Sequence, residues 1–347
     1  MKLTKSIKVV LVAISASSLV LAGTTTGNAA PKKALKSIRI AAVVKGLDNP
    51  FFIGIKEGIE ETAKNYGVYA NVQAAPGLND DIGQANKLDS LAGQNYDCYI
   101  VIPISSNNLS QAVGKITKKK KTVINIDSPI DSASLAAAGG KVTSFAGTDN
   151  FAAGKAGGAK MLAAIGAGKK IGLIAGLAGN VTSNARVDGF KAGAAGSTFV
   201  GPVNADWDTT KALDAANAMI TANKDLAGFF AANDQMAQGV GKALKAAGLK
   251  IPVYGVDGIA DALTEVKAGS ITATISQYPY VMGKMGVEAC IIAAQGGKVP
   301  ASTITPYYII DSSNISAALE NKSTRGYFPN QTPPGAYEDP YTKLIKK

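Results

Sequence analysis

The sequence contains no histidine, and this absence narrows the chemistry that the chain can perform. Neither a Ser-His-Asp triad nor a Cys-His pair can be built. Zinc sites lose their commonest ligand, and acid–base catalysis at neutral pH loses its usual group. Paired carboxylates could still hydrolyse a glycosidic bond, so an enzyme is disfavoured rather than excluded.

Cysteine and tryptophan are scarce, because the chain has only Cys98, Cys290 and Trp207. Cys98 lies in an apolar strand pattern and Cys290 in an apolar helical pattern, and neither has a neighbour that would activate its thiol. Two buried thiols and one disulfide in an oxidising compartment both agree with these positions. A Walker phosphate loop is also missing, and the Gly-Ala-Gly at 166–168 precedes a strand pattern, the wrong order for binding pyrophosphate.

Residues 1–30 have the features of a secretory signal peptide. Lys2, Lys5 and Lys8 precede an apolar run over 9–22, and small residues at 27–30 offer a cleavage site. The run is too short to span a membrane comfortably, and no cysteine near the cleavage site could carry a lipid. We therefore expect an unanchored, exported chain of about 317 residues in a periplasm.

The formal net charge is +11, of which the three signal lysines contribute +3, leaving +8 for the mature chain. The one dense basic run, 118–121, lies between a helix pattern and a strand pattern. A solvated helix end accounts for it, since lysines are favourable at the negative pole of a helix dipole. Aromatic residues are not interleaved with these lysines, so we expect no nucleic-acid partner.

Short apolar strand patterns alternate with helical patterns along the chain. The first pair shows the logic: Asn49 is a typical helix cap, Pro50 suits the first helical position, and Gly67 ends the helix. The expected strands are 38–44, 69–73, 98–102, 122–126, 142–145, 170–175, 199–204, 228–232, 253–256, 271–276 and 307–310. The clearest helices are 80–93, 151–165, 210–222, 235–247 and 281–294. About eleven strands over this length predict a doubly wound α/β chain with two parallel sheets and two cores, followed by a tail without its own core after Ser323.

Polar side chains recur where these strands end. They are Asn49, Asp127, Asn233 with Asp234, Asp257 and Gln277. Any one of them is explained by helix capping alone, but together they converge on one edge of the sheets, where α/β proteins bind ligands. Amides both donate and accept hydrogen bonds and carboxylates accept twice, which suits adjacent hydroxyl groups. Phe51 and Trp207 add flat apolar faces, although core packing would explain Trp207 equally well.

Nine short motifs in order carry a family resemblance. They cover 45–52, 103–106, 125–127, 148–150, 178–180, 206–208, 232–234, 256–258 and 273–277. Through these motifs, residues 38–312 resemble the periplasmic sugar-binding proteins of the ribose, allose and galactose transporter type. Within this family, the resemblance is greatest to the allose-binding kind. The resemblance implies a type I periplasmic binding protein fold, with two lobes joined by three crossing strands near Thr148, Gln277 and Tyr308. The implied divisions are 1–30 for the signal peptide, 31–148 and 278–308 for the first lobe, 149–277 and 309–322 for the second, and 323–347 for the tail.

The resemblance also implies the ligand-binding residues. They are Lys45, Asn49, Phe51, Phe52 and Asp127 in the first lobe, Asn184, Arg186, Trp207, Asn233 and Asp257 in the second, and Gln277 at a hinge. Three positions depart from the family pattern: Ser128 stands where relatives carry Arg or Glu, Asn184 where they carry a charged residue, and Ile102 where the ribose type has Asn. These changes leave the identity of the sugar open.

The resulting hypothesis is a monomeric solute-binding protein without a cofactor. It would capture a monosaccharide or polyol by hinge closure and deliver it to the membrane permease of an ABC transporter. Three alternatives belong to other classes. The same fold could bind an amino acid or signalling compound, with Arg186 and Lys45 as the anion clamp; an exported glycosidase would need paired carboxylates; and a sugar-responsive repressor would begin with a helix-turn-helix.

Overall fold

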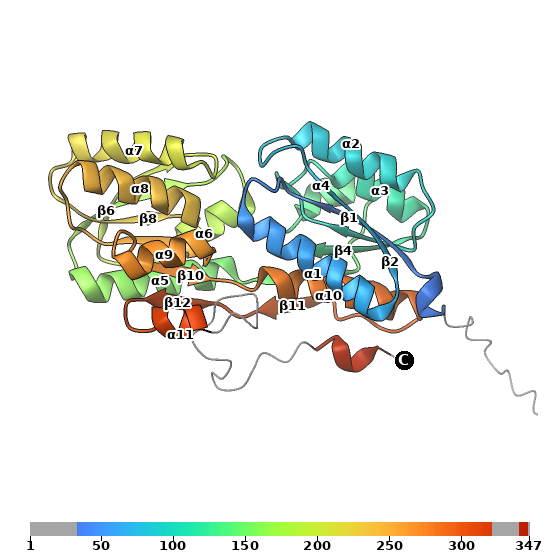
Figure 1. Ribbon diagram of the computed structural model, residues 1–347. Helices are drawn as coiled ribbons and strands as arrows, with labels where there is room; N and C mark the ends of the chain where they lie inside the picture. Colours follow the sequence, from blue (N-terminus) through green and yellow to red (C-terminus); the bar gives the residue numbers. More distant parts are fainter. Residues whose placement is uncertain (1–32, 321–339, 346–347) are drawn as a thin grey trace, which may run out of the picture. The chain divides into compact units, whose positions relative to one another are not determined.

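The computed structural model describes residues 33–320 and 340–345 (Figure 1). The expected signal peptide and most of the expected tail lie outside these residues. Among the residues described, no helix combines the length and the apolar character that crossing a membrane requires.

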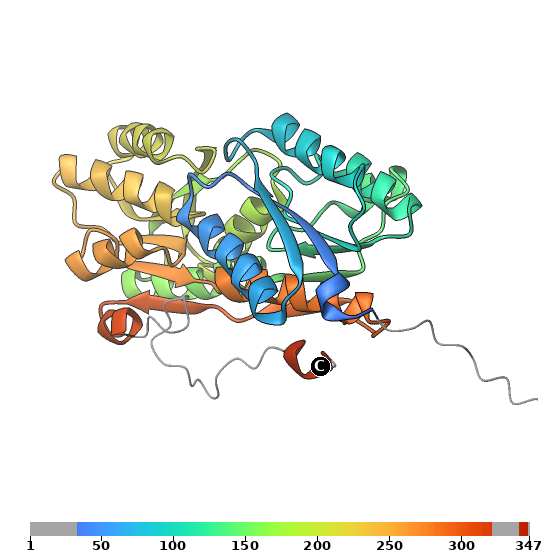
Figure 2. The same cartoon turned by 45° about the vertical axis from the view of Figure 1, so that its right-hand side comes forward.

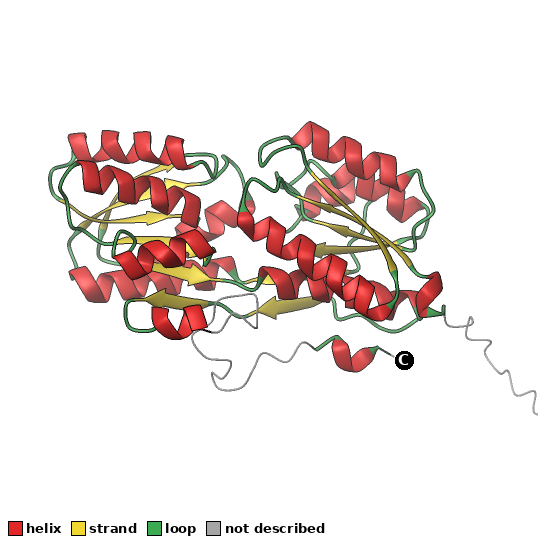
Figure 3. Ribbon diagram, viewed as in Figure 1, coloured by secondary structure: helices red, strands yellow, loops and turns green. Residues whose placement is uncertain are grey.

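Within the described residues, twelve strands form two six-stranded sheets (Figure 3). The first has the order β11-β5-β4-β3-β1-β2 and is parallel throughout. Its strands are β1 (Arg39–Val44), β2 (Tyr69–Ala74), β3 (Cys98–Val101), β4 (Thr122–Ile126), β5 (Ser144–Thr148) and β11 (Ser302–Thr305). The second has the order β12-β10-β9-β8-β6-β7, and only β12 runs antiparallel to its neighbour. Its strands are β6 (Lys170–Ala175), β7 (Thr198–Asn204), β8 (Leu226–Ala231), β9 (Val253–Asp257), β10 (Ala273–Ser276) and β12 (Tyr308–Asp311).

Helices flank each sheet, and we call each sheet with its helices a lobe. The first lobe contains η1 (Leu35–Ser37), α1 (Pro50–Tyr66), α2 (Asp81–Ala92), α3 (Ser110–Lys118), α4 (Ser132–Ala137) and α10 (Pro279–Ala294). The second contains α5 (Asn150–Ile165), α6 (Val181–Gly193), α7 (Thr209–Ala222), α8 (Asp234–Ala246), α9 (Ala260–Ala268) and α11 (Ile315–Glu320). Helices α1 and α10 lie side by side although more than two hundred residues separate them (Figures 1 and 2). Two mostly parallel sheets, each flanked by helices, confirm the predicted doubly wound α/β fold.

The turn from β1 into α1 and the end of α1 follow from local sequence features. Asn49 caps α1 by accepting a hydrogen bond from the backbone N–H of Phe51, and Pro50 occupies the first helical position. Gly67 ends the helix at a φ of 67°, a left-handed conformation that costs glycine little. The chain therefore leaves β1 and enters α1 through a short turn at the carboxyl edge of the sheet.

Some strand boundaries differ from the expectation. The strand expected over 142–145 is β5, which begins at Ser144 and continues past Phe145 through Ala146 and Gly147 to Thr148. Strand β11 was not expected at all, because Ser302–Thr305 contains a single large apolar residue, Ile304, and this side chain is exposed. The β-branched residues 303–305 favour an extended backbone, and parallel pairing with β5 completes the strand.

Three segments join the two lobes. They connect β5 to α5, β10 to α10, and β11 to β12, so the crossings fall at 148–150, 276–279 and 305–308. The hydroxyl groups of Thr148 and Thr305 are hydrogen-bonded at 3.1 Å, and the rings of Tyr278 and Tyr308 meet edge to face. The three crossings are therefore neighbours, as a hinge requires.

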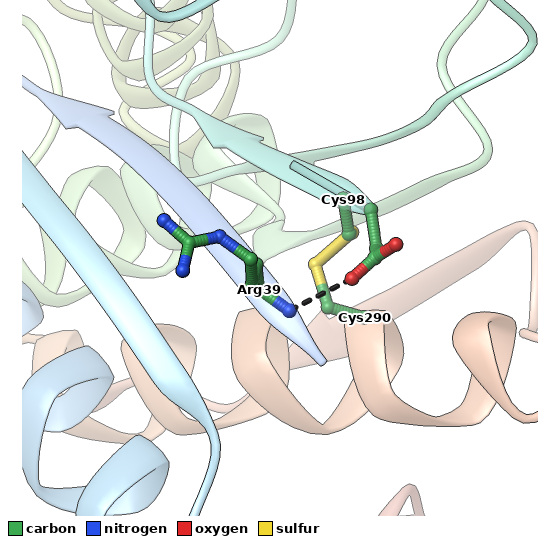
Figure 4. The surroundings of a disulfide bond; sticks show 4 residues. Arg39, Cys98 and Cys290 are labelled. Atoms are coloured by element: carbon green, nitrogen blue, oxygen red, sulfur yellow. Dashed lines mark hydrogen bonds between the residues drawn. A yellow bond between two sulfur atoms is a disulfide. The ribbon is translucent and has the colours of Figure 1, made fainter. Parts of the chain in front are cut away.

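A disulfide joins Cys98 on β3 to Cys290 on α10 (Figure 4). Both side chains are fully buried, and their Cα atoms are 5.5 Å apart. Next to it, the carboxylate of Asp97 accepts a hydrogen bond from the backbone N–H of Arg39 at 2.8 Å. The disulfide, one of the two arrangements left open by the sequence, therefore fixes α10 to the first lobe.

The last described residues also contact the first lobe. Tyr341, just before η3 (Thr342–Leu344), is fully buried, and its hydroxyl is hydrogen-bonded to those of Ser144 and Thr303 at 3.0 Å. The hydroxyl of Thr342 donates to the carboxylate of Glu288 on α10. The end of the expected tail is thus docked on the core of the first lobe.

Candidate ligand-binding site

A cavity with about 430 Å³ of empty space lies where the carboxyl ends of the two sheets meet. Both lobes contribute side chains to its wall. The lining residues are Lys45, Asn49, Phe51, Phe52, Leu78, Ile104, Asp127, Ser128, Thr182, Arg186, Trp207, Asn233 and Asp257. This set includes every residue expected to bind ligand except Asn184 and Gln277.

On the first lobe, Lys45 and Asp127 face each other across Ser128. The Lys45 ammonium donates to the Ser128 hydroxyl at 2.8 Å and lies 3.9 Å from the Asp127 carboxylate, which accepts from Ser128 at 2.7 Å. Burial lowers the pKa of Lys45, and the negative charge of Asp127 partly opposes this effect. Asp127 adopts a φ of 61°, an unusual conformation for a residue with a side chain, as is common at binding sites.

On the second lobe, the Arg186 guanidinium organises the polar groups. Its Nε donates to Asn150 at 2.8 Å, and one terminal nitrogen donates to Asp257 at 3.1 Å and to the carbonyl of Ala232 at 2.7 Å. Gln277 also donates to Asp257, at 2.9 Å. Burial raises the pKa of Asp257 to about 6, although the charge of Arg186 acts in the opposite direction.

Asp234 holds the turn that presents Asp257. It is fully buried, and one carboxylate oxygen accepts from the backbone N–H groups of Gly258 and Ile259 at 2.7 and 3.0 Å. The other oxygen accepts from the Thr274 hydroxyl at 2.6 Å. Burial, followed by the nearby charge of Asp257, raises the pKa of Asp234. Asp234 thus supports the site without lining it.

Asn49 and Asn233 fit both interpretations that the sequence allowed, because each caps a helix and each also lines the cavity. The side-chain oxygen of each caps a helix, accepting from Phe51 in α1 and from Met236 in α8 at 2.9 Å. Within the described ranges, neither amide nitrogen has a protein acceptor, and both residues line the cavity. Each amide therefore offers a donor to a ligand while it starts a helix.

Aromatic rings form part of the wall. Phe51 and Phe52 meet edge to face at 5.3 Å, and the Lys45 ammonium lies 5.2 Å from the centre of the Phe52 ring. The Trp207 ring packs against Gly176 so closely that a Cβ there would collide with it. Trp207 therefore contributes both to packing and to the cavity.

Two expected residues do not line the cavity, although one of them, Gln277, lies in the second crossing between the lobes. Asn184 is exposed on α6, because two residues along a helix turn the side chain by about 200° from Thr182 and Arg186, which face inward. Gln277 is buried behind Asp257 and bonds to it, so it touches the cavity only through that carboxylate.

Four lining residues were not expected to bind ligand. Leu78 is an apolar loop residue outside every motif, Ile104 lies in the motif 103–106 that could have located it, and Ser128 was noted only as a departure from the family pattern. Thr182 follows the helix cap Asn180 by two positions. Motif 178–180 next to it was the one signal that could have led to Thr182.

The charges within the cavity are compensated. Lys45 lies beside Asp127, and Arg186 is bonded to Asp257, so two cations face two carboxylates in the wall. A ligand with a net charge would have to displace one of these partners and leave a buried charge unpaired, which is costly. The cavity suits an uncharged ligand that both donates and accepts hydrogen bonds.

Comparisons with known proteins agree with this fold. The sequence model of the family described as "Periplasmic binding protein domain" matches residues 40–298. The chain is 36% identical over 297 residues to the D-allose-binding periplasmic protein of Escherichia coli, covering 84% of this chain and 96% of that relative. It is 31% identical over 272 residues to a ribose import binding protein of Bacillus subtilis, covering 78% and 86%. The solved structure of an ABC transporter periplasmic solute-binding protein from Actinobacillus succinogenes with bound D-allose has a TM-score of 0.75 at 30% identity, covering 80% of this chain and 99% of that one.

Proposed function

The chain belongs to the periplasmic binding protein domain family, and from that premise we propose that it binds an uncharged monosaccharide or polyol between its lobes and delivers it to an ABC permease. The charge-compensated cavity carries this proposal. Its amide donors at Asn49 and Asn233 and carboxylate acceptors at Asp127 and Asp257 match the edge of a sugar ring, and its aromatic rings match the faces. Relatives named for D-allose and ribose support the same ligand class.

An amino acid or another anionic ligand fits less well. Arg186 and Lys45 were the candidates for an anion clamp, but Arg186 is bonded to Asp257, and Lys45 donates to Ser128 beside Asp127. A ligand carboxylate would compete with these internal partners. We therefore place the amino-acid alternative second.

Closure around the ligand is the proposed mechanism. The cavity takes its wall from both lobes, so a ligand that touches both walls favours the closed arrangement by its differential affinity. The three neighbouring crossings supply the hinge. The permease would then recognise the pair of lobe surfaces brought together by closure.

Lobe boundaries and cellular location belong to the same proposal. We assign 31–148 and 278–308 to the first lobe and 149–277 and 309–322 to the second. We further propose export to the periplasm by a cleaved signal peptide at 1–30, and release as a monomer. The buried disulfide between Cys98 and Cys290 supports this location, because disulfides persist in oxidising compartments.

A thermal-shift screen of the mature chain tests the ligand class. Pentoses, hexoses, deoxysugars, polyols and amino acids are compared, and hits are measured by calorimetry. A true ligand at about 100 times its Kd should add about 2.7 kcal/mol of apparent stability. Stabilisation by amino acids with no response to any carbohydrate or polyol would overturn the proposal.

We also propose that the chain is not an enzyme. The carboxylates that a glycosidase would use, Asp127 and Asp257, are engaged with Ser128 and Arg186 respectively. Incubation with chromogenic glycosides should release no dye above the buffer rate. Turnover that is lost in Asp257→Asn would contradict this part of the proposal.

A further inference from the structure

Asn180 connects the two lobes through a single buried side chain. Its side-chain oxygen accepts from the backbone N–H of Ser183 at 3.0 Å and so caps α6 in the second lobe. Its side-chain nitrogen donates to the carbonyl of Ile104 in the first lobe at 2.9 Å. The residue is only 2% exposed, so neither hydrogen bond is shared with bulk water.

The acceptor of this bond is held in a rigid frame. Ile104 donates its own N–H to the side-chain oxygen of Gln84 at 3.0 Å. The Gln84 amide in turn donates to the carbonyls of Val44, at 3.2 Å, and Ile102, at 2.8 Å, and the residue is fully buried. Through Gln84, the backbone at Ile104 is therefore fixed relative to the ends of β1 and β3. The cavity residue Lys45 directly follows β1.

The donor side belongs to the helix that carries ligand-facing residues. Thr182 and Arg186, both on α6, line the cavity, and the Thr182 hydroxyl lies 3.4 Å from that of Ser128 in the first lobe. When Asn180 bonds to Ile104, these side chains are therefore set against the opposite wall.

Among the described residues, the hydrogen bond from the Thr182 hydroxyl to that of Ser128 is also buried but is long, at 3.4 Å, whereas two further hydrogen bonds between the lobes lie at the exposed rim. Asn79 donates to the carbonyl of Asp206 at 3.3 Å, and Gln235 donates to the carbonyl of Asp48 at 3.1 Å. Water can replace a partner at an exposed position, so such bonds contribute little net free energy. A buried carbonyl that loses its donor has no such replacement.

We propose that the Asn180–Ile104 hydrogen bond is the latch of the closed form, and that Asn180 is a positioning residue for ligand retention. This inference rests on the proposed function, because it assumes that closure traps a sugar. The bond can form only after the lobes meet. Its loss should therefore speed dissociation of the ligand and leave association nearly unchanged.

Two substitutions separate the latch from the helix cap. Ser and Asp cap helices about as well as Asn, but Ser is too short to span the gap and Asp has no donor for the Ile104 carbonyl. With D-allose as the probe, Asn180→Ser and Asn180→Asp should raise Kd by about 5- to 100-fold, mostly through a faster dissociation rate. The melting temperature of the sugar-free variants should stay close to that of the wild type. Gln235→Ala, which removes a rim hydrogen bond, is the matched control and should change Kd by less than about twofold.

Solution scattering gives a second measurement, the radius of gyration, which would not change if Asn180 only capped α6. Added D-allose should reduce the radius of gyration of the wild type and of Gln235→Ala, and reduce it less in Asn180→Ser. Equal Kd and dissociation rates in all variants would overturn the latch while leaving the proposed function intact. If no sugar binds the wild type, the proposed function fails separately. The latch then fails as well, because it assumes that closure traps a sugar.

Discussion

At the scale of single residues, the same side chain can start a helix and serve the ligand. Asn233 can do both, because its oxygen accepts from Met236, the residue lines the cavity, and its amide nitrogen has no acceptor among the described residues. The helix-cap interpretation and the binding interpretation are thus not rivals at this position. They predict different consequences for different substitutions.

Asn233→Ser should weaken binding without weakening the fold. Serine still caps α8, so the free energy of unfolding should change by only a few tenths of a kcal/mol, whereas Asn233→Ala should lose about 1 kcal/mol. Both variants lack the amide donor and should lose sugar affinity by about tenfold or more. Chemical denaturation and calorimetry measure the two effects separately. Unchanged affinity in Asn233→Ser would show that the amide does not contact the ligand, and Asn184→Ala, exposed on α6, should change neither quantity.

The pH dependence of binding should report on Asp257. Its pKa is about 6 in the fold, above the ordinary value of 3.8, so its protonated form contributes stability to the sugar-free protein below about pH 4, and this contribution is lost as the pH rises through 6. A sugar hydroxyl that donates to the carboxylate prefers the ionised form. Affinity should therefore fall as the pH drops below about 6, with proton release on binding near that pH. Calorimetry in buffers of different ionisation enthalpy tests this prediction. An affinity of the wild type that does not change with pH, and that Asp257→Asn does not alter, would contradict it.

Sequence patterns located polar residues at strand ends better than residues on helix faces. Asp127 and Asp257 follow buried apolar runs, and the direction of a parallel strand places them at the ligand edge. Asn184 was implied by the family resemblance, but the structure places it on the exposed side of α6, about 200° around the helix from Thr182 and Arg186. Ile104 lies in the family motif 103–106, but Leu78 lies in none of the motifs, and an apolar loop residue looks the same in sequence whether it faces a core or a cavity.

At the scale of elements, α10 is held to the first lobe in three ways. It packs against α1, its Glu288 accepts a hydrogen bond from the Tyr66 hydroxyl of α1 at 2.8 Å, and the disulfide joins it to β3. Because α10 directly follows the second crossing, these contacts anchor one end of the hinge. The sequence placed this helix correctly, but the spacing of two cysteines does not reveal whether they meet.

Removing the disulfide should cost stability and leave ligand affinity unchanged. Cys98→Ala with Cys290→Ala frees a loop of 192 residues in the unfolded chain, and native disulfides of this kind contribute about 2–5 kcal/mol. Neither cysteine lines the cavity. Thermal melts of the sugar-free double variant should show a lower Tm, and calorimetry should show a Kd close to that of the wild type. A large loss of affinity at a temperature where the variant is folded would mean that the disulfide also controls closure.

At the scale of the whole molecule, two lobes of similar design share one site that neither completes alone. The first supplies Lys45 and Asp127, and the second supplies Arg186 and Asp257, so the cavity exists only where both carboxyl edges meet. The alternation of strand and helix patterns predicted this architecture, whereas β11 depended on pairing with a distant partner.

The interleaved path of the chain sets the order in which the protein can be completed. Strand β11 and helix α10, which finish the first lobe, come from residues 279–305, after nearly all of the second lobe has been made. A chain emerging from the ribosome or from a translocation pore can therefore assemble most of its second lobe before the first sheet gains β11, one of its two edge strands. The first lobe therefore stays incomplete until most of the second lobe has been synthesised.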